Sequence, residues 1–260
     1  MTQTWKYCTK MFGKTILLLL LLTQDSVKSL RLVDLRVPSH EREGGKVRLG
    51  CQYDLQEDKL YAVKWYKDGE EFYRYVPRDI PNAYYFHVDG VKVDIERSSN
   101  NAVTLINLTQ ESSGNYSCEV DSDAPYFSVE VRSKYMHIHF LPKTRPRVKG
   151  LKELYNLNEL VAANCSLGPS RPNAHLVWFV NDRPAPVSYV SGPWHRVSAE
   201  RPDAAETILQ LSFTATETNF INGAIKLKCQ ATIAPLYQKE KESTHYIALP
   251  IIEEKEIKDA

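Results

Sequence analysis

The stretch CQYDLQEDKLYAVKWYKDGEEFYRYVP, residues 51–77, decides the fold, because one cysteine and one tryptophan stand in it among five tyrosines and many charges. Trp65 follows Cys51 by 14 residues, and the next cysteine, Cys118, follows Cys51 by 67. This spacing is typical of an immunoglobulin sandwich, in which the tryptophan packs against a disulfide that joins the two sheets. The stretch therefore predicts an immunoglobulin-like domain.

The same pattern occurs a second time along the chain. Trp178 follows Cys165 by 13 residues, and Cys229 follows Cys165 by 64. Four cysteines allow three pairings on paper, but pairing within each repeat is the economical one. We therefore expect an all-β protein of two tandem immunoglobulin-like β-sandwiches, the first closed by Cys51–Cys118 and the second by Cys165–Cys229.

The first repeat is predicted to be V-like. Its span leaves room for the extra strands C′ and C″ of a variable-type sheet. Apolar residues alternate with a period of two along three predicted strands: Val47, Leu49 and Cys51 on B, Val63 and Trp65 on C, Val103 and Leu105 on E. Tyr116 is expected to bond to the backbone as a tyrosine corner, although Ser112 stands where Asp is usual. Leu227 replaces this tyrosine in the second repeat, which is therefore more divergent.

The N-terminus resembles a secretion signal. Three lysines precede the apolar run 16–22, and residues 27–29 include small side chains suited to cleavage. The run is shorter than the roughly 20 residues that span a bilayer. We expect a secreted, extracellular protein with these parts: signal peptide 1–29, V-like immunoglobulin domain 30–141, linker 142–146, second immunoglobulin-like domain 147–252 and charged tail 253–260. The tail has no apolar stretch for an anchor, which favours a soluble form.

The charge and the motifs exclude several function classes. After the signal, 29 Lys and Arg stand against 31 Asp and Glu, which gives no bulk attraction for nucleic acid. The sequence has no G-x-S-x-G or H-E-x-x-H motif and no free cysteine once both pairs form, so we predict no enzyme and no cofactor. His137 and His139 alternate on a predicted strand, but no third ligand is evident, so no metal is predicted.

The Asp68-Gly69 step predicts a two-residue hairpin turn that places Trp65 opposite Phe72 and Lys64 opposite Tyr73. Trp65 points inward, so residues of the other parity are expected on the outer face of strands C, C′, F and G. Strand G is assigned with Phe127, Val129 and Val131 inward. The tyrosines suggest a contact surface for a partner protein, and its predicted residues are Lys64, Tyr66, Glu71, Tyr73, Tyr75, Glu119, Asp121, Tyr126 and Ser128. The alternative is that these tyrosines only fit a half-buried strand surface.

Three sequons predict N-linked glycans, in keeping with secretion. Asn107 and Asn115 lie at the predicted corner between strands E and F, where glycans would leave the middle of the outer face open. Asn164 is expected to point outward beside Cys165 in the second domain.

The junction LPKTRPRV, residues 141–148, is expected to be a stiff extended link because of its two prolines. Four basic residues alternate along this region and would project to one side: Lys143, Arg145, Arg147 and Lys149. They make a glycosaminoglycan such as heparan sulfate a rival partner. The alternative is a solvated link between the domains.

The stretch at 51–77 closely resembles the first immunoglobulin domain of the beaten path family of insect neuronal proteins, and its run KWYKDGxEFYR is the most selective part. The likeness continues through VDIERSSNNAVTLINLTQESSGNYSCEV and the loop 123–125, and more weakly through NCSLGPSRPNAHLVWFVNDRPAP. It implies a secreted or membrane-tethered recognition protein. Such a protein binds cell-surface immunoglobulin proteins of the sidestep family through its first domain, in axon guidance or synaptic partner choice. The alternative is a soluble immune or carrier module with another partner.

Overall fold

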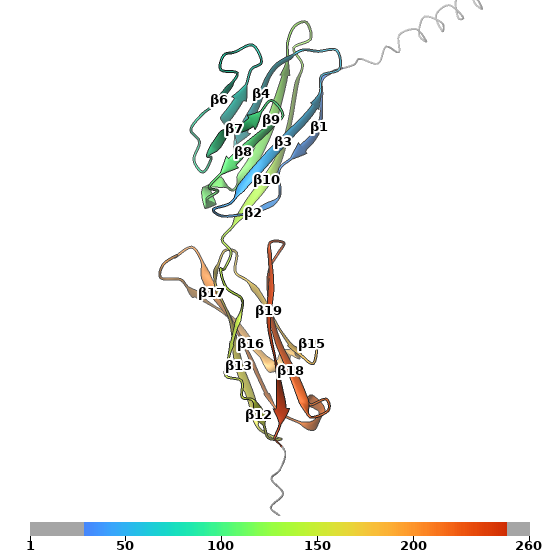
Figure 1. The fold of residues 1–260 in the computed structure, drawn as a ribbon, viewed down its shortest axis with the longest axis vertical. Helices are drawn as coiled ribbons and strands as arrows, with labels where there is room; N and C mark the ends of the chain where they lie inside the picture. Colours follow the sequence, from blue (N-terminus) through green and yellow to red (C-terminus); the bar gives the residue numbers. More distant parts are fainter. Residues whose placement is uncertain (1–28, 249–260) are drawn as a thin grey trace, which may run out of the picture.

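The computed structural model describes residues 29–248. The predicted signal peptide, except for its last residue, and the predicted tail at 253–260 lie outside the described residues. Within them the chain forms four β-sheets, which pair into two sandwiches joined end to end (Figure 1). The predicted all-β fold of two immunoglobulin-like domains is confirmed.

The first sandwich pairs a four-stranded sheet with a six-stranded sheet. The first of these has the order β1 (Arg31–Arg36), β3 (Lys46–Asp54), β8 (Ala102–Ile106) and β7 (Val93–Ser99). The second has the order β2 (His40–Arg42), β10 (Val129–His139), β9 (Gly114–Ser122), β4 (Leu60–Lys67), β5 (Glu70–Tyr75) and β6 (Ala83–Tyr85). Strands β5 and β6 are the predicted C′ and C″ strands, so the V-like assignment holds.

The second sandwich has the same plan with fewer strands on one side. One sheet has the order β11 (Arg147–Lys149), β13 (Leu160–Ser170), β17 (Ala205–Thr214) and β16 (Val190–Val197). The other has the order β12 (Leu154–Tyr155), β19 (Tyr237–Ile247), β18 (Ala224–Ile233), β14 (His175–Val180) and β15 (Arg183–Pro184). Short 3-10 helices are η1 (Gln110–Ser112), η2 (Val187–Tyr189) and η3 (Glu217–Asn219).

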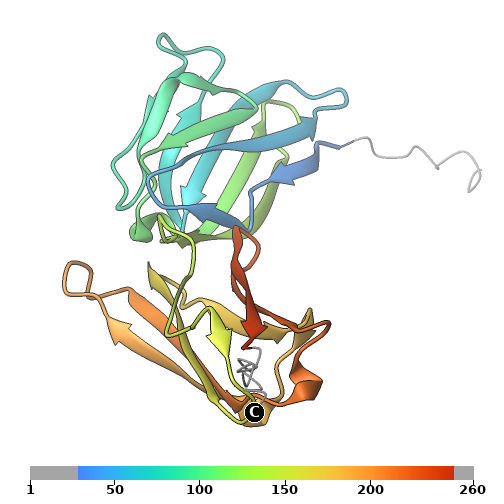
Figure 2. The ribbon, with the colours of Figure 1, turned by 60° about the horizontal axis from the view of Figure 1, so that its bottom comes forward.

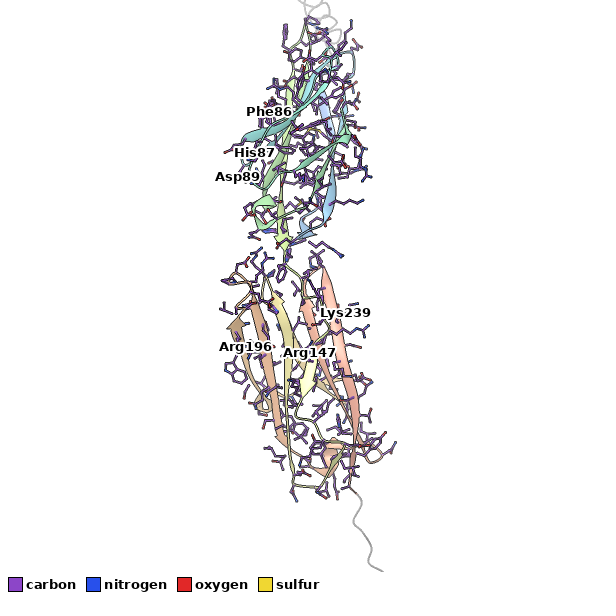
Figure 3. All side chains as sticks on the ribbon, turned by 60° about the vertical axis from the view of Figure 1, so that its left-hand side comes forward. Phe86, His87, Asp89, Arg147, Arg196 and Lys239 are labelled. Carbon is purple, nitrogen blue, oxygen red and sulfur yellow. A yellow bond between two sulfur atoms is a disulfide. The ribbon has the colours of Figure 1, made fainter. Side chains whose placement is uncertain are left out.

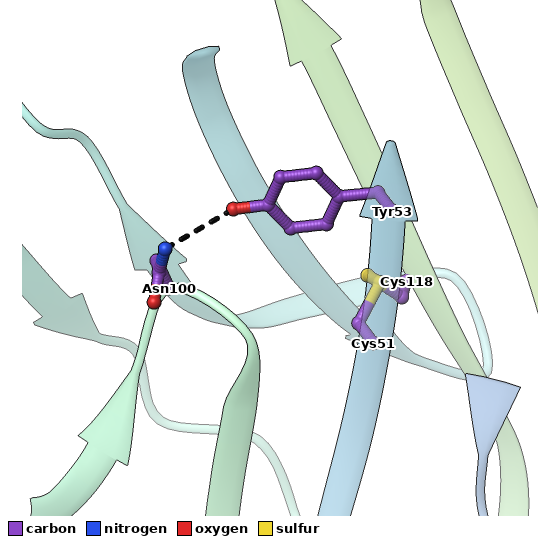
Figure 4. Close-up of a disulfide and its surroundings, with 4 residues drawn as sticks. All are labelled: Cys51, Tyr53, Asn100 and Cys118. Atoms are coloured by element: carbon purple, nitrogen blue, oxygen red, sulfur yellow. Dashed lines mark hydrogen bonds between the residues drawn. A yellow bond between two sulfur atoms is a disulfide. The ribbon is translucent and has the colours of Figure 1, made fainter. Parts of the chain in front are cut away.

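Each sandwich has its own core around one disulfide. Both predicted pairings are present, and the two tryptophans beside them, Trp65 and Trp178, are buried. Near the first disulfide, the Tyr53 hydroxyl accepts a hydrogen bond of 3.3 Å from Asn100 Nδ2 (Figure 4). The apolar residues predicted to face inward on strands B, C and E are all buried in the first core: Val47, Leu49, Val63, Val103 and Leu105.

The predicted tyrosine corner is also present. The Tyr116 hydroxyl donates to the Ser112 carbonyl oxygen at 2.7 Å. Ser112 in turn accepts from the Thr109 backbone N–H at 2.8 Å and donates to the Gly90 carbonyl at 2.5 Å. Gly90 has φ +76°, and a Cβ there would collide with the backbone of Glu111. Ser112, which stands where aspartate is usual, therefore links η1 to the turn at Gly90 by its hydrogen bond to the Gly90 carbonyl.

The two domains contact each other through their facing ends (Figures 1 and 2). Phe140 and Arg171 exchange two backbone hydrogen bonds of 2.9 Å. Arg201 donates to Glu43 Oε2 at 2.7 Å, and its guanidinium lies 4.2 Å above the Phe140 ring. Hydrogen bonds and a cation–π contact therefore hold the junction.

Candidate binding face of the first domain

We use the name front face for the outer surface of β10, β9, β4 and β5. The predicted hairpin turn is present, since Asp68 has φ 52° and Gly69 has φ 91°. Tyr66 faces Glu71 beside the turn, but Trp65 then faces Tyr73. One extra residue, Phe72, forms a β-bulge in β5. The predicted register is therefore wrong beyond Tyr66, where the parity of β5 reverses.

This bulge moves two predicted contact residues to the core side. Tyr73 has no exposed surface, and its hydroxyl donates to the Ser99 carbonyl oxygen at 3.2 Å. Burial raises the pKa of Tyr73 to about 12. Tyr75 faces Val63 and packs partly against the core. The prediction that Tyr73 and Tyr75 lie on the outer face is wrong, and Arg74 occupies that face instead, opposite Lys64.

The predicted parity of strand G is also wrong. Val129 faces Asp121 and Val131 faces Glu119, so both valines lie on the front face, with 57% and 52% of their surface exposed. Met136 is the residue of β10 that is fully buried. The valines are exposed because the inward parity of β10 is set by the core residues at its other end.

Two predicted contact residues, Tyr126 and Ser128, lie in the loop between β9 and β10, at one end of the front face. Tyr126 and Phe127 project with 64% and 67% of their surface exposed, so the inward assignment of Phe127 is wrong. Asp123 fixes the start of the loop, because its carboxylate pairs with Arg78 and its N–H donates to the Lys59 carbonyl at 2.8 Å. The rings are thus held on an anchored loop.

A half-buried ionic cluster occupies the middle of the front face. Lys64 Nζ lies 2.8 Å from Glu119 Oε1 and 2.6 Å from Asp121 Oδ2. These three side chains keep only 20%, 22% and 11% of their surface exposed. Burial alone would lower the pKa of Lys64, but its bonds to Asp121 and Glu119 raise it above its usual range. Lys64 therefore stays protonated, and two carboxylates share its cation.

Tyr66 contacts this cluster, and a second ion pair, Arg74 with Glu71, lies on the neighbouring strand. The Tyr66 hydroxyl donates to Glu119 Oε1 at 3.2 Å, and burial together with the charge of Glu119 raises the pKa of Tyr66 to about 12. Arg74 binds Glu71 through two hydrogen bonds of 2.7 Å. Its guanidinium lies 5.8 Å from the Phe86 ring, which Figure 3 shows at the margin of the domain. The front face thus joins paired charges to neutral rings.

Sequence reasoning missed several residues of this surface: Tyr61, Arg74, Phe86, Val129, Val131 and Tyr135. Tyr61 lies at a register shift in β4, 49% exposed and within electrostatic reach of Arg74. Counting back by twos from Met136 gives the correct parity of β10, so that signal was available. No comparable pattern in the sequence indicates the bulge at Phe72, because Phe72 and Tyr73 are both aromatic and either ring suits the core.

The three sequon asparagines are exposed. Asn115 faces Tyr135, so it lies on the front face itself, at the start of β9. Asn107 lies in the turn after β8 with φ 52°. Asn164 lies on β13, opposite Lys149. Of the two sequons expected at the corner, the one at Asn115 is therefore on the front face itself, four positions before Glu119 on β9.

The expectation that four basic residues project to one side of the linker is wrong. Arg147 and Lys149 lie on β11 and line one depression of the second domain. Arg145 lies instead beside Lys239 and Glu240 of β19. The chain enters the sheet only at Arg147, so the alternation of β11 does not extend back along the linker.

Three histidines near the junction lie close together. His40 Nδ1 lies 2.8 Å from His139 Nε2, and the His40 and His137 rings stack with centroids 5.4 Å apart. Within residues 29–248, no group of three or more His, Cys, Asp or Glu side chains could hold a metal ion.

Comparison with known proteins agrees with this architecture. The immunoglobulin V-set domain model matches residues 37–139. A search of curated proteins finds no match. The structure of murine CEACAM1b is 19% identical, covers 85% of this chain and 100% of its own, and has a TM-score of 0.55.

Two further structures cover 85% of this chain. The match to the structure of the mouse coronavirus receptor-binding domain complexed with its murine receptor is 18% identical, with a TM-score of 0.51 and 100% of the matched chain covered. Rst D1-D2 is 12% identical, with a TM-score of 0.49 and 99% of its chain covered.

At these identities the structures with TM-scores of 0.55 and 0.51 show the fold alone. The two disulfides indicate an oxidising, extracellular environment. No helix in residues 29–248 has the length and apolar character to cross a membrane. Residues 37–139 therefore form an immunoglobulin domain of the V-set type, and the second sandwich has an immunoglobulin-like fold.

Proposed function

We propose that this chain is a secreted recognition ligand whose front face binds cell-surface immunoglobulin proteins of the sidestep family, in axon guidance or synaptic partner choice. One observation carries the proposal. Exposed apolar residues on β4 and β10 border an ionic cluster that the fold has already half buried. Such a surface suits a protein partner, because interface centres are rich in aromatic rings and poor in hydrated charge.

The cost of desolvation supports this assignment. Lys64 is paired with both Glu119 and Asp121 and all three are largely buried, so a partner that covers them displaces less water than it would from fully exposed charges. Val129 and Val131 add apolar area beside the cluster, and each Å² of apolar surface that leaves water contributes about 25 cal/mol. The geometry favours a second sheet face as the partner surface, because packed sheets lie face to face.

The family resemblance points to the same place. The run KWYKDGEEFYR, which carries the likeness to the beaten path family, forms the hairpin of β4 and β5. That hairpin supplies Lys64, Tyr66, Glu71 and Arg74 to the front face. The most selective part of the sequence and the proposed contact surface therefore coincide.

A cell-surface binding screen tests the proposal. The purified protein is applied to cells that each display one extracellular immunoglobulin protein of the source organism. We expect binding to a sidestep-type protein, lost in the Val131→Arg variant and retained in Glu240→Arg. Glu240 is the matched position in the second domain, since it faces Gln230 just after Cys229 as Val131 faces Glu119 just after Cys118. Binding only to unrelated proteins, or loss only in Glu240→Arg, would contradict the proposal.

A further inference from the structure

The chain is nearly neutral as a whole, but its two domains carry opposite net charges. Residues 30–141 contain 14 Lys and Arg against 18 Asp and Glu, whereas residues 142–248 contain 13 against 9. The first domain therefore carries a net charge of −4 and the second a net charge of +4. A polyanion would be repelled by the first domain and attracted to the second.

The second domain also has a place where a linear polyanion can lie. A depression of about 330 Å³ begins at Phe140 and Lys143, next to the junction. A second depression of about 620 Å³ extends along β11 to Arg147 and Lys149. The two depressions form one continuous trough, because they share four of their lining residues: Thr144, Gly168, Pro169 and Ser198.

The cations along the trough are available to a ligand. Lys143, Arg147 and Lys149 are exposed, and none of them has a carboxylate partner among residues 29–248. Two carboxylates also line the trough: that of Glu206 is held by Arg196, whose Nε lies 2.9 Å away, and Glu200 lies in the first depression. The hydroxyls of Thr144, Ser166 and Ser198 can bond to sugar or sulfate oxygens, and Gly168 has no side chain to obstruct the floor.

We propose that this trough binds a segment of a sulfated glycosaminoglycan, with Lys143, Arg147 and Lys149 on its sulfate and carboxylate groups. The site lies apart from the front face, so it does not depend on the proposed function. It differs from the basic linker expected from the sequence, because Arg145 lies outside it, beside β19, where Figure 3 labels Lys239. Arg147 and Arg196 are labelled in the same view of the trough side.

Asn164 bears on the design of the test, because it faces Lys149 across β11 and β13. A glycan on this asparagine would stand at the end of the trough. The experiment therefore uses the full secreted chain with Asn164→Gln as the parent, so that every variant presents the same uncovered surface.

Binding to immobilised heparin is measured by surface plasmon resonance at physiological salt. The trough variant carries Lys143→Ser, Arg147→Ser and Lys149→Ser. Its control carries Arg145→Ser, Lys239→Ser and Lys241→Ser, which removes the same charge from the other side of the domain. The trough variant would release fewer counterions from heparin when it binds, so we expect its affinity to fall roughly tenfold or more and that of the control to fall clearly less.

Desulfated heparin should bind the parent weakly, because sulfate groups supply the charge that the trough recognises. Equal losses in the two triple variants would mean that bulk charge alone attracts heparin, and unchanged binding in the trough variant would place the site elsewhere. Either result overturns the proposal. Binding of the trough variant to its cell-surface partner should not change, which separates this test from that of the front face.

Discussion

The front face of the first domain and the equivalent sheet face of the second domain differ in how far their ion pairs are buried. In the first, Lys64 is shared by Glu119 and Asp121, and all three are largely buried. In the second, Lys226 pairs with Asp182 and Glu242, whose side chains keep 60% and 39% of their surface exposed. Exposed ion pairs stay hydrated and contribute little to stability. A partner that covered the second face would therefore have to desolvate more charge and would gain less binding free energy. Recognition therefore suits the first face.

The strand that follows the tryptophan strand is also longer and more buried in the first domain than in the second. Strand β5 has six residues, two of them buried rings, and β6 extends the sheet beyond it. Its counterpart β15 has two residues, both exposed. A buried aromatic pair thus anchors the β4–β5 hairpin to the core of the first domain, whereas the two residues of β15 bury no side chain in the second core.

The largest effect should come from the buried ring that anchors β5. Tyr73→Ala removes a fully buried aromatic side chain, and such changes cost about 3 to 5 kcal/mol. Urea unfolding followed by fluorescence should show the first domain destabilised by this amount and the second unchanged. If Tyr73 lay on the surface, as the hairpin turn alone predicts, the change would stay within about 0.5 kcal/mol.

A smaller difference should separate the two ionic clusters. Lys64→Ala leaves two half-buried carboxylates without their cation, which should cost about 1 to 3 kcal/mol. Lys226→Ala breaks exposed pairs and should cost less than about 1 kcal/mol. Paired denaturation curves at low salt measure both values. Equal costs would remove the distinction between a desolvated and a hydrated face.

The smallest effect concerns pH, at the end of the first domain that meets the second. Burial lowers the pKa of His139 below its ordinary value of 6.5, and the charges of His40, His137 and Arg171 lower it further. The folded state therefore binds fewer protons than the unfolded state just below pH 6.5. Stability is fully present above this pH and is lost as the pH falls toward the lowered pKa.

Thermal unfolding of the first domain at pH 7.5 and 5.5 should show this loss, and His139→Gln should make it shallower. The groups that face His139 are those of its own cluster, His40 and His137, together with Arg171 from the second domain. A variant with the same pH dependence as the parent would assign the effect to other groups.

The frame of the fold could be predicted because it depends on residue identity at fixed spacing. Cys51, Trp65 and Cys118 meet in one contact that few other arrangements satisfy, and Tyr116 has one place to send its hydroxyl. These constraints act within the core and do not depend on the register of the outer strands. The same is true of the second disulfide and Trp178.

The candidate face was harder to predict because it depends on parity, which one residue can reverse. The bulge at Phe72 buries two neighbouring rings, Phe72 and Tyr73, and so moves Arg74 outward. Val129 and Val131 were assigned inward because an apolar side chain suggests a core, yet a contact surface uses the same side chains. Lys64, Tyr66 and Glu119 lie on the outer face as expected, because each adjoins Trp65 or Cys118, and Glu71 does so because it lies close to the turn. Asp121 follows Glu119 by two positions on β9.

The central claim is that the front face of the first domain, and not its counterpart, binds the partner. The most direct test is surface plasmon resonance of Tyr66→Ala and Phe179→Ala against the partner found in the cell-surface screen. The two residues are matched, since each follows the buried tryptophan of its domain by one position. We expect Tyr66→Ala to lose about 2 kcal/mol of binding free energy, roughly thirtyfold in affinity, and Phe179→Ala to bind like the parent. Loss of binding in Phe179→Ala with full binding in Tyr66→Ala would contradict the claim.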